Sequence, residues 1–505
     1  MARPETPSKI LVVLPNNLGD VIMATPVMEG LAKKHKNTHV MFFCEEGFEP
    51  GMENNPFCSQ LITFPRKTVR DLLRQNWRAG KELCSLCVND IAGYGWDTVI
   101  NLSQQNHISL LVSLFGGKSV LGQRYRAEGN HCIDDPWSQY LYAIPFARSC
   151  NNLHASDVFR RIAGVKSHRG GYSLSLAERE ESWARKFLAD RGFGGAAAEK
   201  TMAFQPGAAF PSKRWPAEYF VKLGSMLAND GWRILVTGAP VERDVAGAIA
   251  AHIGSAAVSV AGDTTFRQSM SLVSMCQGCV TGDTAQMHAS AGFDVPTYAL
   301  FGPTNPVETG PYGNGHMVFS GRCGSMPCFK TECGSRECMK SILPEDVYVC
   351  ISSGSCPPSC SCNAYRTVLN RDGDYSLDAC RAAMHRYFHE GAVCLVRNIF
   401  DDRWNCVPGS ADYAHGVAET GKWLEIVSDM CNALTRYEKT RDARYVTMFE
   451  VIKKSLGGLT SVGAFCTAVL NLRLNSIPLL APLDAVRQNI EVCWQTHKQV
   501  GRAIS

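Results

Sequence analysis

The sequence predicts two doubly wound α/β domains followed by an all-helical domain. Short apolar runs alternate with helical patterns after residue 9, and the same alternation begins again near residue 201. A Cys/Pro/Ser-rich break at residues 352–361 then leads into a segment that has helical periodicity only. Because 505 residues with 45% hydrophobic content exceed one ordinary core, we place the domains at residues 1–180, 181–352 and 363–505.

The apolar runs of both α/β domains are typical of strands that are buried on both faces of a parallel sheet. In the first domain we expect strands at residues 10–14, 39–44 and 97–102, and a helix at residues 20–35. In the second domain we expect strands at residues 202–205, 233–237, 278–281 and 297–301, and a helix at residues 217–230. Ligands of such sheets bind at the carboxyl ends of the strands, so the residues that follow these runs are candidates for a site.

The third domain is expected to be a helical bundle. Its expected helices are residues 377–397, 415–436, 444–470 and 483–503. A packing or oligomerisation role is the simpler interpretation, and a module that docks an acceptor or a membrane is the alternative.

The charge balance argues against a nucleic-acid binder, because 51 basic and 47 acidic residues leave a net charge of only +4. The apolar run at residues 10–14 is too short for a secretory signal. Polar residues and a proline interrupt residues 459–483, which therefore lack the roughly 20 apolar residues of a membrane span. We expect a cytoplasmic protein whose membrane contact would be peripheral, at the inner face of the inner membrane.

Asp20 follows the first strand and a glycine turn, in the segment Pro15-Asn-Asn-Leu-Gly-Asp-Val-Ile22. This position puts a carboxylate at the edge of the first domain, where a helix begins. Two interpretations stay open, namely that Asp20 caps its helix or that it is a general base facing a cleft.

Lys213 lies in a loop rich in small residues, residues 205–216, after the first strand of the second domain. Small residues such as Gly207 let backbone N–H groups approach a phosphate, and Lys213 adds a positive charge. Trp215 and Pro216 anchor the end of the loop, which argues against the alternative of a freely solvated loop.

Two further strand ends carry acidic residues. Gly238 precedes Glu242, whose carboxylate can accept both hydroxyls of a ribose or simply stabilise the helix dipole. Asp283 follows another strand, and the helix that begins at Thr284 and Ala285 offers free N–H groups to an anion. His288 in that helix is as compatible with a packed core residue as with a functional one.

Four cysteines recur every five residues, a spacing that does not fit one face of a helix and so indicates a loop. They are Cys323, Cys328, Cys333 and Cys338. Four thiolates in a short loop could close a tetrahedral structural zinc site, although the common spacings are tighter. Cys356, Cys360 and Cys362 extend the cluster with more donors than can be assigned.

In combination these motifs resemble glycosyltransferase family 9, the bacterial lipopolysaccharide heptosyltransferases, over about residues 9–352. The similar features are Leu18-Gly-Asp-Val-Ile22, Lys213-Arg-Trp-Pro216, Gly238 with Glu242, Gly282-Asp-Thr with Met287-His288, and Phe301-Gly-Pro-Thr304. The resemblance implies a GT-B fold, in which two Rossmann-like domains face each other. It assigns the acceptor to residues 1–180 and the nucleotide sugar to residues 181–352.

The resemblance also implies a role for each candidate residue. Asp20 would deprotonate the acceptor hydroxyl, Lys213 would hold the diphosphate, Glu242 the ribose and Asp283 sugar hydroxyls, while the backbone at Thr284 and Ala285 would bind phosphate. The family usually has glycine at the position of Ala285, and some members have hydroxyl residues where this chain has Ala208 and Ala209. No Asp-x-Asp motif lies near these residues, so we expect no catalytic metal and no required cofactor.

The leading functional interpretation is an inverting transferase that moves heptose from ADP-heptose to a glycolipid acceptor of the lipopolysaccharide core. The alternatives are a different nucleotide sugar on the same fold, and a catalytically silent scaffold that binds nucleotides or glycans. The presence of Asp20, Lys213 and Asp283 argues against the scaffold.

Overall fold

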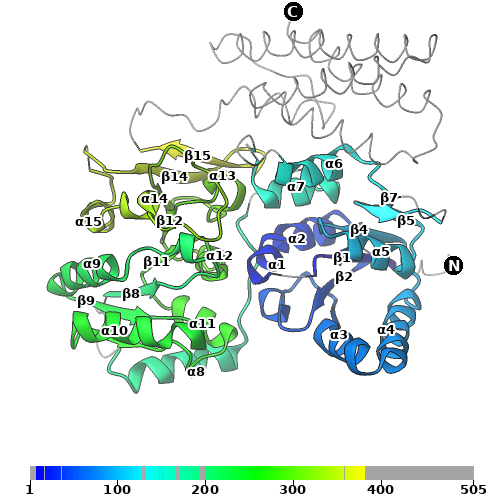
Figure 1. Ribbon diagram of the computed structural model, residues 1–505, viewed down its shortest axis with the longest axis horizontal. Coiled ribbons are helices and arrows are strands. Elements are labelled where there is room, and N and C mark those ends of the chain that lie inside the picture. Colours follow the sequence, from blue (N-terminus) through cyan, green and yellow to red (C-terminus); the bar gives the residue numbers. More distant parts are fainter. Residues whose placement is uncertain are drawn as a thin grey trace, which may run out of the picture. The chain divides into compact units, whose positions relative to one another are not determined.

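The computed structural model describes residues 7–380, apart from residues 16, 36, 128, 130, 147, 149, 150, 152, 167, 169, 194–199 and 358. Two large sheets with flanking helices make up most of this part (Figure 1). Except for the end of one edge strand, both sheets belong to a single compact unit. The predicted fold class, with two doubly wound α/β sheets, is confirmed. The expected helices from residue 415 onward lie outside the described residues.

The first sheet is a five-stranded sheet in the order β3-β2-β1-β4-β5. Its strands are β1 (Ser8–Val13), β2 (Thr38–Glu45), β3 (Gln60–Phe64), β4 (Thr98–Asn101) and β5 (Ser119–Leu121). β1 lies in the middle and pairs in parallel with β2 and β4, as expected for its uninterrupted apolar run.

The helix expected at residues 20–35 is divided at Ala24 into α1 (Leu18–Met23) and α2 (Thr25–Lys34). Pro26 lies in the first turn of α2, where a missing N–H is tolerated but cannot continue the bonding pattern of α1. The later helices of this region are α3 (Arg66–Gln75), α4 (Trp77–Ala92), α5 (Asn106–Phe115), α6 (Pro136–Ala143) and α7 (Ala155–Ile162).

The second sheet has eight strands in the order β10-β9-β8-β11-β12-β13-β14-β15. They are β8 (Lys200–Gln205), β9 (Trp232–Val236), β10 (Ala257–Ser259), β11 (Gly278–Gly282), β12 (Thr297–Phe301), β13 (Met317–Ser320), β14 (Asn363–Leu369) and β15 (Tyr375–Ala379). The strands up to β13 are parallel, whereas β14 and β15 are antiparallel. The carboxyl ends of β9, β8, β11 and β12 consequently lie next to one another at one edge.

Helices cover both faces of the second sheet, as the alternation of side chains along each strand requires. Met202 and Phe204 pack with α9 (Ala217–Asn229), α10 (Arg243–Ile253) and α15 (Pro344–Ser353). Ala203 packs on the opposite face with α8 (Glu178–Ala189) and α11 (Phe266–Val273). The shorter helices of this half are α12 (Ala285–Gly292), α13 (Pro306–Thr309) and α14 (Glu337–Lys340).

The boundary expected between the second domain and the helical domain is wrong. Residues 363–379 form β14 and β15, and the helix expected at residues 377–397 would begin inside β15. Tyr365 and Thr367 are buried while Arg366 between them is exposed, which is the period of two of a strand with one buried face. The α/β fold therefore extends to at least residue 379.

A second compact unit contains residues 103–113 and 120–153 of the described part. Its strands β6 (Arg124–Tyr125) and β7 (His131–Cys132) pair antiparallel. Asp135 caps α6, because its carboxylate accepts a hydrogen bond from the Ser138 N–H at 2.8 Å. Among the helices of the described residues, none combines the length and the apolar character that a membrane span requires.

Candidate functional site

The predicted donor residues gather at the carboxyl edge of the second sheet. Gly207 follows β8, Gly238 follows β9 and Asp283 follows β11, and these three strands are neighbours in the order β9-β8-β11. A Cβ atom added at Gly282 would lie 3.3 Å from the backbone oxygen of Lys213, so the loop after β8 crosses the end of β11. Residues that are far apart in the sequence thus come together at one edge.

Lys213 and Asp283 form a buried ion pair, in which Nζ lies 2.7 Å from Oδ2. The exposed fractions of the two side chains are only 18% and 9%. Burial alone would raise the pKa of Asp283, but the charge and hydrogen bond of Lys213 outweigh it, and the pKa is lowered. The carboxylate therefore stays ionised and holds the ammonium group at the start of α12.

The loop that carries Lys213 is held from both sides. The Ser212 N–H donates to the Thr331 carbonyl oxygen at 3.2 Å, and the indole N–H of Trp215 donates to the Ile342 carbonyl oxygen at 2.9 Å. Within the loop, Arg214 Nε donates to the Ala208 carbonyl oxygen at 3.0 Å. The expectation of an anchored loop is confirmed, and the segment around Thr331 is an additional support that the sequence did not reveal.

The start of α12 has the geometry of an anion site. Thr284 is the N-cap residue and Ala285 is the first helical residue, so the first backbone N–H groups have no partner within the helix. The Thr284 hydroxyl instead pairs with the Thr281 hydroxyl at 3.0 Å. Lys213 and these N–H groups lie at the same carboxyl edge of the second sheet. The full charge of the ammonium group and the partial charges of the N–H groups can therefore attract the same bound anion.

Glu242 lies against the turn that follows β8. Its Oε2 accepts hydrogen bonds from the Ala239 N–H at 2.8 Å and from Gln205 Nε2 at 3.1 Å. A Cβ atom added at Gly207 would lie 1.6 Å from Glu242 Oε1, so any larger residue here would push the Glu242 carboxylate out of its place. Glu242 therefore occupies a fixed position between the ends of β8 and β9, and one of its oxygens stabilises its own turn.

Asp20 lies in the first turn of α1, and its Oδ2 accepts a hydrogen bond from Asn17 Nδ2 at 2.9 Å. The helix begins close to α12, since a Cβ atom added at Gly19 would lie 3.0 Å from His288 Cδ2 and 3.8 Å from Ala285 Cα. The structure thus brings the segment of Asp20 to the helix that opens the anion site.

His288 is a packed residue between these two segments. It is 3% exposed, and its Nδ1 lies 2.9 Å from the hydroxyl oxygen of Tyr172. Burial lowers the pKa of His288 to about 3, so its ring is neutral at physiological pH. Of the two interpretations that the sequence left open, this environment favours the core residue. Tyr172 was not predicted, because nothing in its local sequence indicates a partner 116 positions away.

Arg267 of α11 connects the two α/β halves. Its guanidinium group pairs with the Glu180 carboxylate, with Nε 2.8 Å from Oε1. It also donates to the carbonyl oxygens of Pro50 at 3.4 Å, Glu53 at 3.2 Å and Ser175 at 2.9 Å. Arg267 was not predicted either, since a lone arginine in a helix has no motif.

In the part of the chain that the structure describes, Cys323, Cys328, Cys333 and Cys338 are not a group whose donor atoms all converge, although the thiol of Cys338 interacts electrostatically with the other three. Cys338 is buried in the core of the second sheet, whereas Cys333 points to a serine at its own turn. Among the described residues, the group whose donor atoms converge is instead Asp346, Cys360 and Cys362. Cys84 and Cys87 lie on α4.

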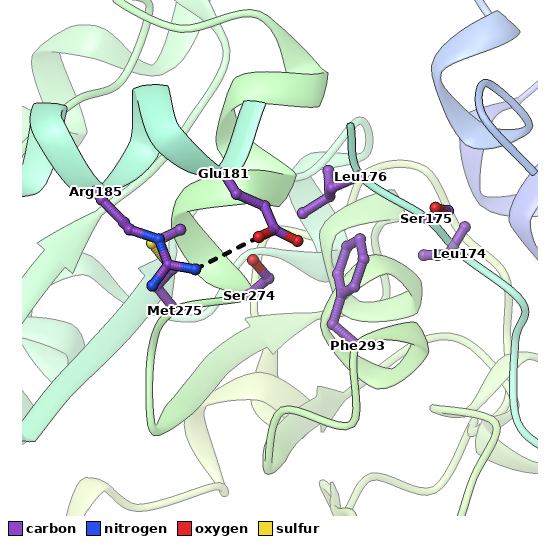
Figure 2. A pocket seen from close by; sticks show the side chains of 8 residues that line it. All are labelled: Leu174, Ser175, Leu176, Glu181, Arg185, Ser274, Met275 and Phe293. Carbon is purple, nitrogen blue, oxygen red and sulfur yellow. Dashed lines mark hydrogen bonds and ion pairs between the residues drawn. The ribbon is translucent and has the colours of Figure 1, made fainter. Parts of the chain in front are cut away.

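An open pocket of about 590 Å³ lies away from the predicted residues (Figure 2). It is lined by Leu174, Ser175, Leu176, Glu181, Arg185, Ser274, Met275 and Phe293. Phe293 ends α12, so the pocket lies at the opposite end of this helix from Thr284. None of the residues singled out from the sequence lines it.

Comparison with known proteins agrees with this arrangement. Residues 88–339 match the family described as glycosyltransferase family 9 (heptosyltransferase). Lipopolysaccharide heptosyltransferase 1 of Pseudomonas aeruginosa is 27% identical over 335 residues, which are 64% of this chain and 87% of that protein. Lipooligosaccharide heptosyltransferase 2 of Haemophilus influenzae is 24% identical over 309 residues, which are 60% and 85% of the two chains.

A crystal structure of a family 9 glycosyltransferase from Veillonella parvula has the same fold, with a TM-score of 0.58 and 23% identity. The similarity covers 70% of this chain and 98% of that one. The chain belongs to glycosyltransferase family 9.

Proposed function

We propose that this protein transfers heptose from ADP-heptose to a glycolipid acceptor of the lipopolysaccharide core, with inversion at the anomeric carbon. The observation that carries the proposal is the buried pair of Lys213 and Asp283 beside the start of α12, with the Asp20 segment against the same helix. The names of the relatives as lipopolysaccharide and lipooligosaccharide heptosyltransferases support the choice of sugar and acceptor.

In the proposed reaction the acceptor hydroxyl attacks the anomeric carbon as the bond to the diphosphate breaks. Asp20 takes the hydroxyl proton, and the ADP leaves with the bonding electrons. Lys213 and the backbone N–H groups at Thr284 and Ala285 stabilise the negative charge that develops on the diphosphate. Because these donors are held in place before the reaction, no metal is needed for this step in our proposal.

The other proposed contacts to the nucleotide sugar come from residues at the carboxyl ends of the strands of the second sheet. Glu242 binds the ribose hydroxyls beside Gly207 and Gly238, and Asp283 orients Lys213 and contacts sugar hydroxyls. His288 is proposed to act through packing only, because its buried neutral ring fills the space between α1 and α12.

We place the protein in the cytoplasm, where α3 and α4 would contact the anionic inner face of the membrane. Trp77 is 60% exposed at the start of α4, and Leu73 and Leu86 are also exposed. Lys81 lies over the Trp77 ring, with its Nζ 5.4 Å from the centroid. Exposed apolar side chains next to basic ones are typical of interfacial helices. The basic residues nearby are Arg66, Lys67, Arg70, Arg74 and Arg78.

The test of the transfer reaction uses the purified protein, a heptose-free core glycolipid and a panel of nucleotide sugars. Mass spectrometry should detect a heptose added only when ADP-heptose is supplied, and Asp20→Asn should form this product much more slowly. Addition of a different sugar from a UDP or GDP donor would replace the proposed donor. Binding of ADP without any transfer would support a silent scaffold instead.

Membrane docking is tested separately by sedimentation with lipid vesicles. The full-length protein should bind vesicles that contain anionic lipid more strongly than neutral ones, and Trp77→Ser with Arg74→Glu should reduce this binding. Equal binding by this double variant would exclude α3 and α4 as the docking surface.

A further inference from the structure

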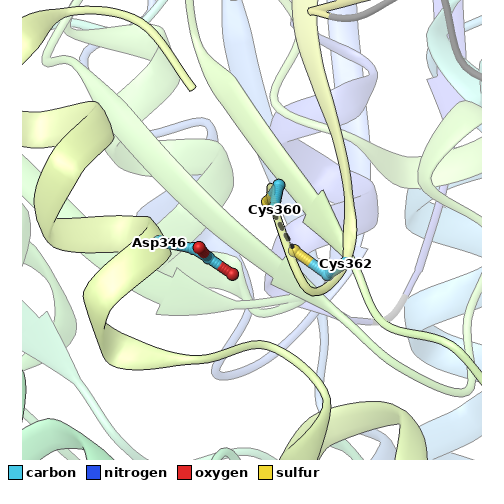
Figure 3. Close-up of side chains that lie close together, drawn as sticks. All are labelled: Asp346, Cys360 and Cys362. Carbon is cyan, nitrogen blue, oxygen red and sulfur yellow. Dashed lines mark hydrogen bonds between the residues drawn. The ribbon is translucent and has the colours of Figure 1, made fainter. Parts of the chain in front are cut away.

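Three side chains that take no part in the proposed transfer converge beside β14 (Figure 3). Asp346 lies in the first turn of α15, and Cys360 and Cys362 flank Ser361 just before β14 begins. Their carboxylate and thiol donor atoms all lie within 4.8 Å of one another. They come from two segments that the fold brings together.

The spacing of the two thiols suits a single metal ion. Cys360 Sγ and Cys362 Sγ are 3.6 Å apart. Two thiolates bound to one tetrahedral zinc at about 2.3 Å are separated by roughly 3.7 Å, so the side chains need almost no movement. A Cys-x-Cys pair is also short enough for both sulfur atoms to reach the same side of the chain, as Figure 3 shows.

The carboxylate is already oriented. The Ser361 N–H donates to Asp346 Oδ2 at 2.8 Å, and the Ser361 hydroxyl bonds to the same oxygen. This leaves Asp346 fixed by the residue between the two cysteines, in the way that outer hydrogen bonds orient metal ligands. Asp346 is 8% exposed, and neither Ser361 nor the neighbouring thiols offers it a positive charge. A buried carboxylate of this kind is stabilised by a cation.

Cys356 lies outside the converging group of three and is the candidate for a fourth donor. Its thiol interacts electrostatically with those of Cys360 and Cys362, and its Sγ lies 3.0 Å from Cys350 Sγ. Cys380 is a further hydrogen-bond partner of Cys356. The sulfur-rich surroundings favour zinc over magnesium or calcium, which prefer oxygen ligands.

We propose that Asp346, Cys360 and Cys362, with Cys356 as the fourth ligand, bind one structural zinc ion. The bound thiols lose their protons, which are released to solvent when the metal enters. The ion would fasten residues 356–362 to α15 and so fix the point at which the chain enters β14. This position lies outside the loop of Cys323 to Cys338 and does not depend on the transfer reaction.

The test measures zinc in the full-length protein after purification from zinc-supplemented cells. Elemental analysis should find a zinc equivalent that is lost in Asp346→Asn, Cys360→Ser and Cys362→Ser. The matched controls are Cys323→Ser and Cys333→Ser, which should keep it. Replacement of zinc by Co²⁺ should give a thiolate-to-cobalt absorption band that disappears with the same three variants.

Wild-type protein provides a readout that does not require the variants to fold. Slow removal of zinc with a chelator should lower the unfolding temperature, and added zinc should restore it. An unchanged zinc content in Cys360→Ser and Cys362→Ser would overturn the proposal. So would a Cys350–Cys356 disulfide found by mass spectrometry in freshly purified, metal-free protein, and iron in place of zinc would overturn the choice of metal.

Discussion

Arg161 and Asp374 form a buried bidentate ion pair, in which Nη1 lies 2.7 Å from Oδ1 and Nη2 lies 2.9 Å from Oδ2. Arg160 Nη2 approaches the same Oδ1 at 2.8 Å. The pair joins α7, which follows the first sheet, to the turn between β14 and β15. Residues 363–379, which lie beyond the expected boundary, are therefore integrated into the α/β fold.

Truncation after residue 352 should destabilise the protein, because it removes the Asp374 carboxylate from the buried Arg161 and leaves the buried Arg160 with Asp157 as its remaining carboxylate partner. Breaking a buried pair by removing one partner costs about 3–5 kcal/mol. A chain of residues 1–380 keeps both strands and should remain soluble and bind ADP. Thermal unfolding and ADP calorimetry of both truncations check this, with Asp374→Asn in the full chain as the matched variant. A stable 1–352 chain with full ADP affinity would show that β14 and β15 are dispensable.

Asp20→Asn should leave ADP affinity nearly unchanged and lower turnover by about 10²–10⁴-fold, the usual effect of losing a general base. The asparagine keeps the size of the side chain and its contact with Asn17. Steady-state transfer kinetics and ADP calorimetry separate the two effects, and Asn17→Ala serves as the control. Turnover close to wild type would reduce Asp20 to a helix-capping residue.

Lys213→Ala should weaken ADP binding by roughly 10–100-fold, the range for losing a hydrogen bond to a charged group. The exposed Lys222→Ala, in the same domain, should have no such effect. The lowered pKa of Asp283 keeps its carboxylate ionised at neutral pH, so the ion pair stabilises the fold there and is lost only when the pH falls through that lowered pKa. The double variant Lys213→Ala with Asp283→Ala, compared with the two single variants, measures how strongly the two residues depend on each other in binding ADP. Additive effects of the two substitutions on ADP affinity would contradict a shared site.

Gly207→Ala should displace Glu242, because the added methyl group would lie 1.6 Å from Glu242 Oε1. We expect weaker binding of ADP with a smaller effect on stability, since the clash lies at the edge of the sheet. Gly247→Ala in α10 is the matched control, as nothing lies within 4 Å of its added Cβ. Equal ADP affinity in the two variants would remove Glu242 from the donor site.

Acid should destabilise the protein through three buried histidines. Burial lowers the pKa of His288 to about 3, and of His154 and His316 to about 4. Unfolded histidines titrate near pH 6.5, so below that pH the unfolded chain binds protons that the folded chain does not, and stability falls. At pH 5 each histidine lowers the free energy of unfolding by about 2 kcal/mol. Chemical denaturation measures the free energy of unfolding at pH 7 and at pH 5. The decrease between the two pH values should be smaller for His316→Gln than for the control variant His252→Gln, whose histidine is exposed.

The sequence predicted the candidate site best where a charged residue directly follows a strand. Lys213, Asp283 and the start of α12 could be placed because strand ends and helix starts have local signals. The strands β14 and β15 were missed, because their half-buried alternation lies next to a segment of helical periodicity. The convergence of Asp346, Cys360 and Cys362 was not predicted, since spacing along a loop does not determine which donor atoms converge.

Long-range partners could not be predicted for a physical reason. Tyr172 and His288 are 116 positions apart, and Arg161 and Asp374 are 213 apart. Each pair depends on how two separately recognisable elements pack, and Tyr172, Arg161 and Asp374 belong to no motif of their own. Gln205 is a case between these two. The sequence predicted its position at the end of β8, but it did not predict the hydrogen bond of Gln205 to Glu242.

The Arg267 contacts have a mechanical consequence. One guanidinium group is bonded to carbonyl oxygens of the first half and to the Glu180 carboxylate of the second through five hydrogen bonds. Separating α11 from residues 50–53 would break these bonds together, so the contact at Arg267 should stay closed if other parts of the two halves move apart. If substrate entry requires α1 to move away from α12, the motion should therefore be a rotation with its axis near Arg267. A small angular change at this pivot would then become a larger displacement at Asp20.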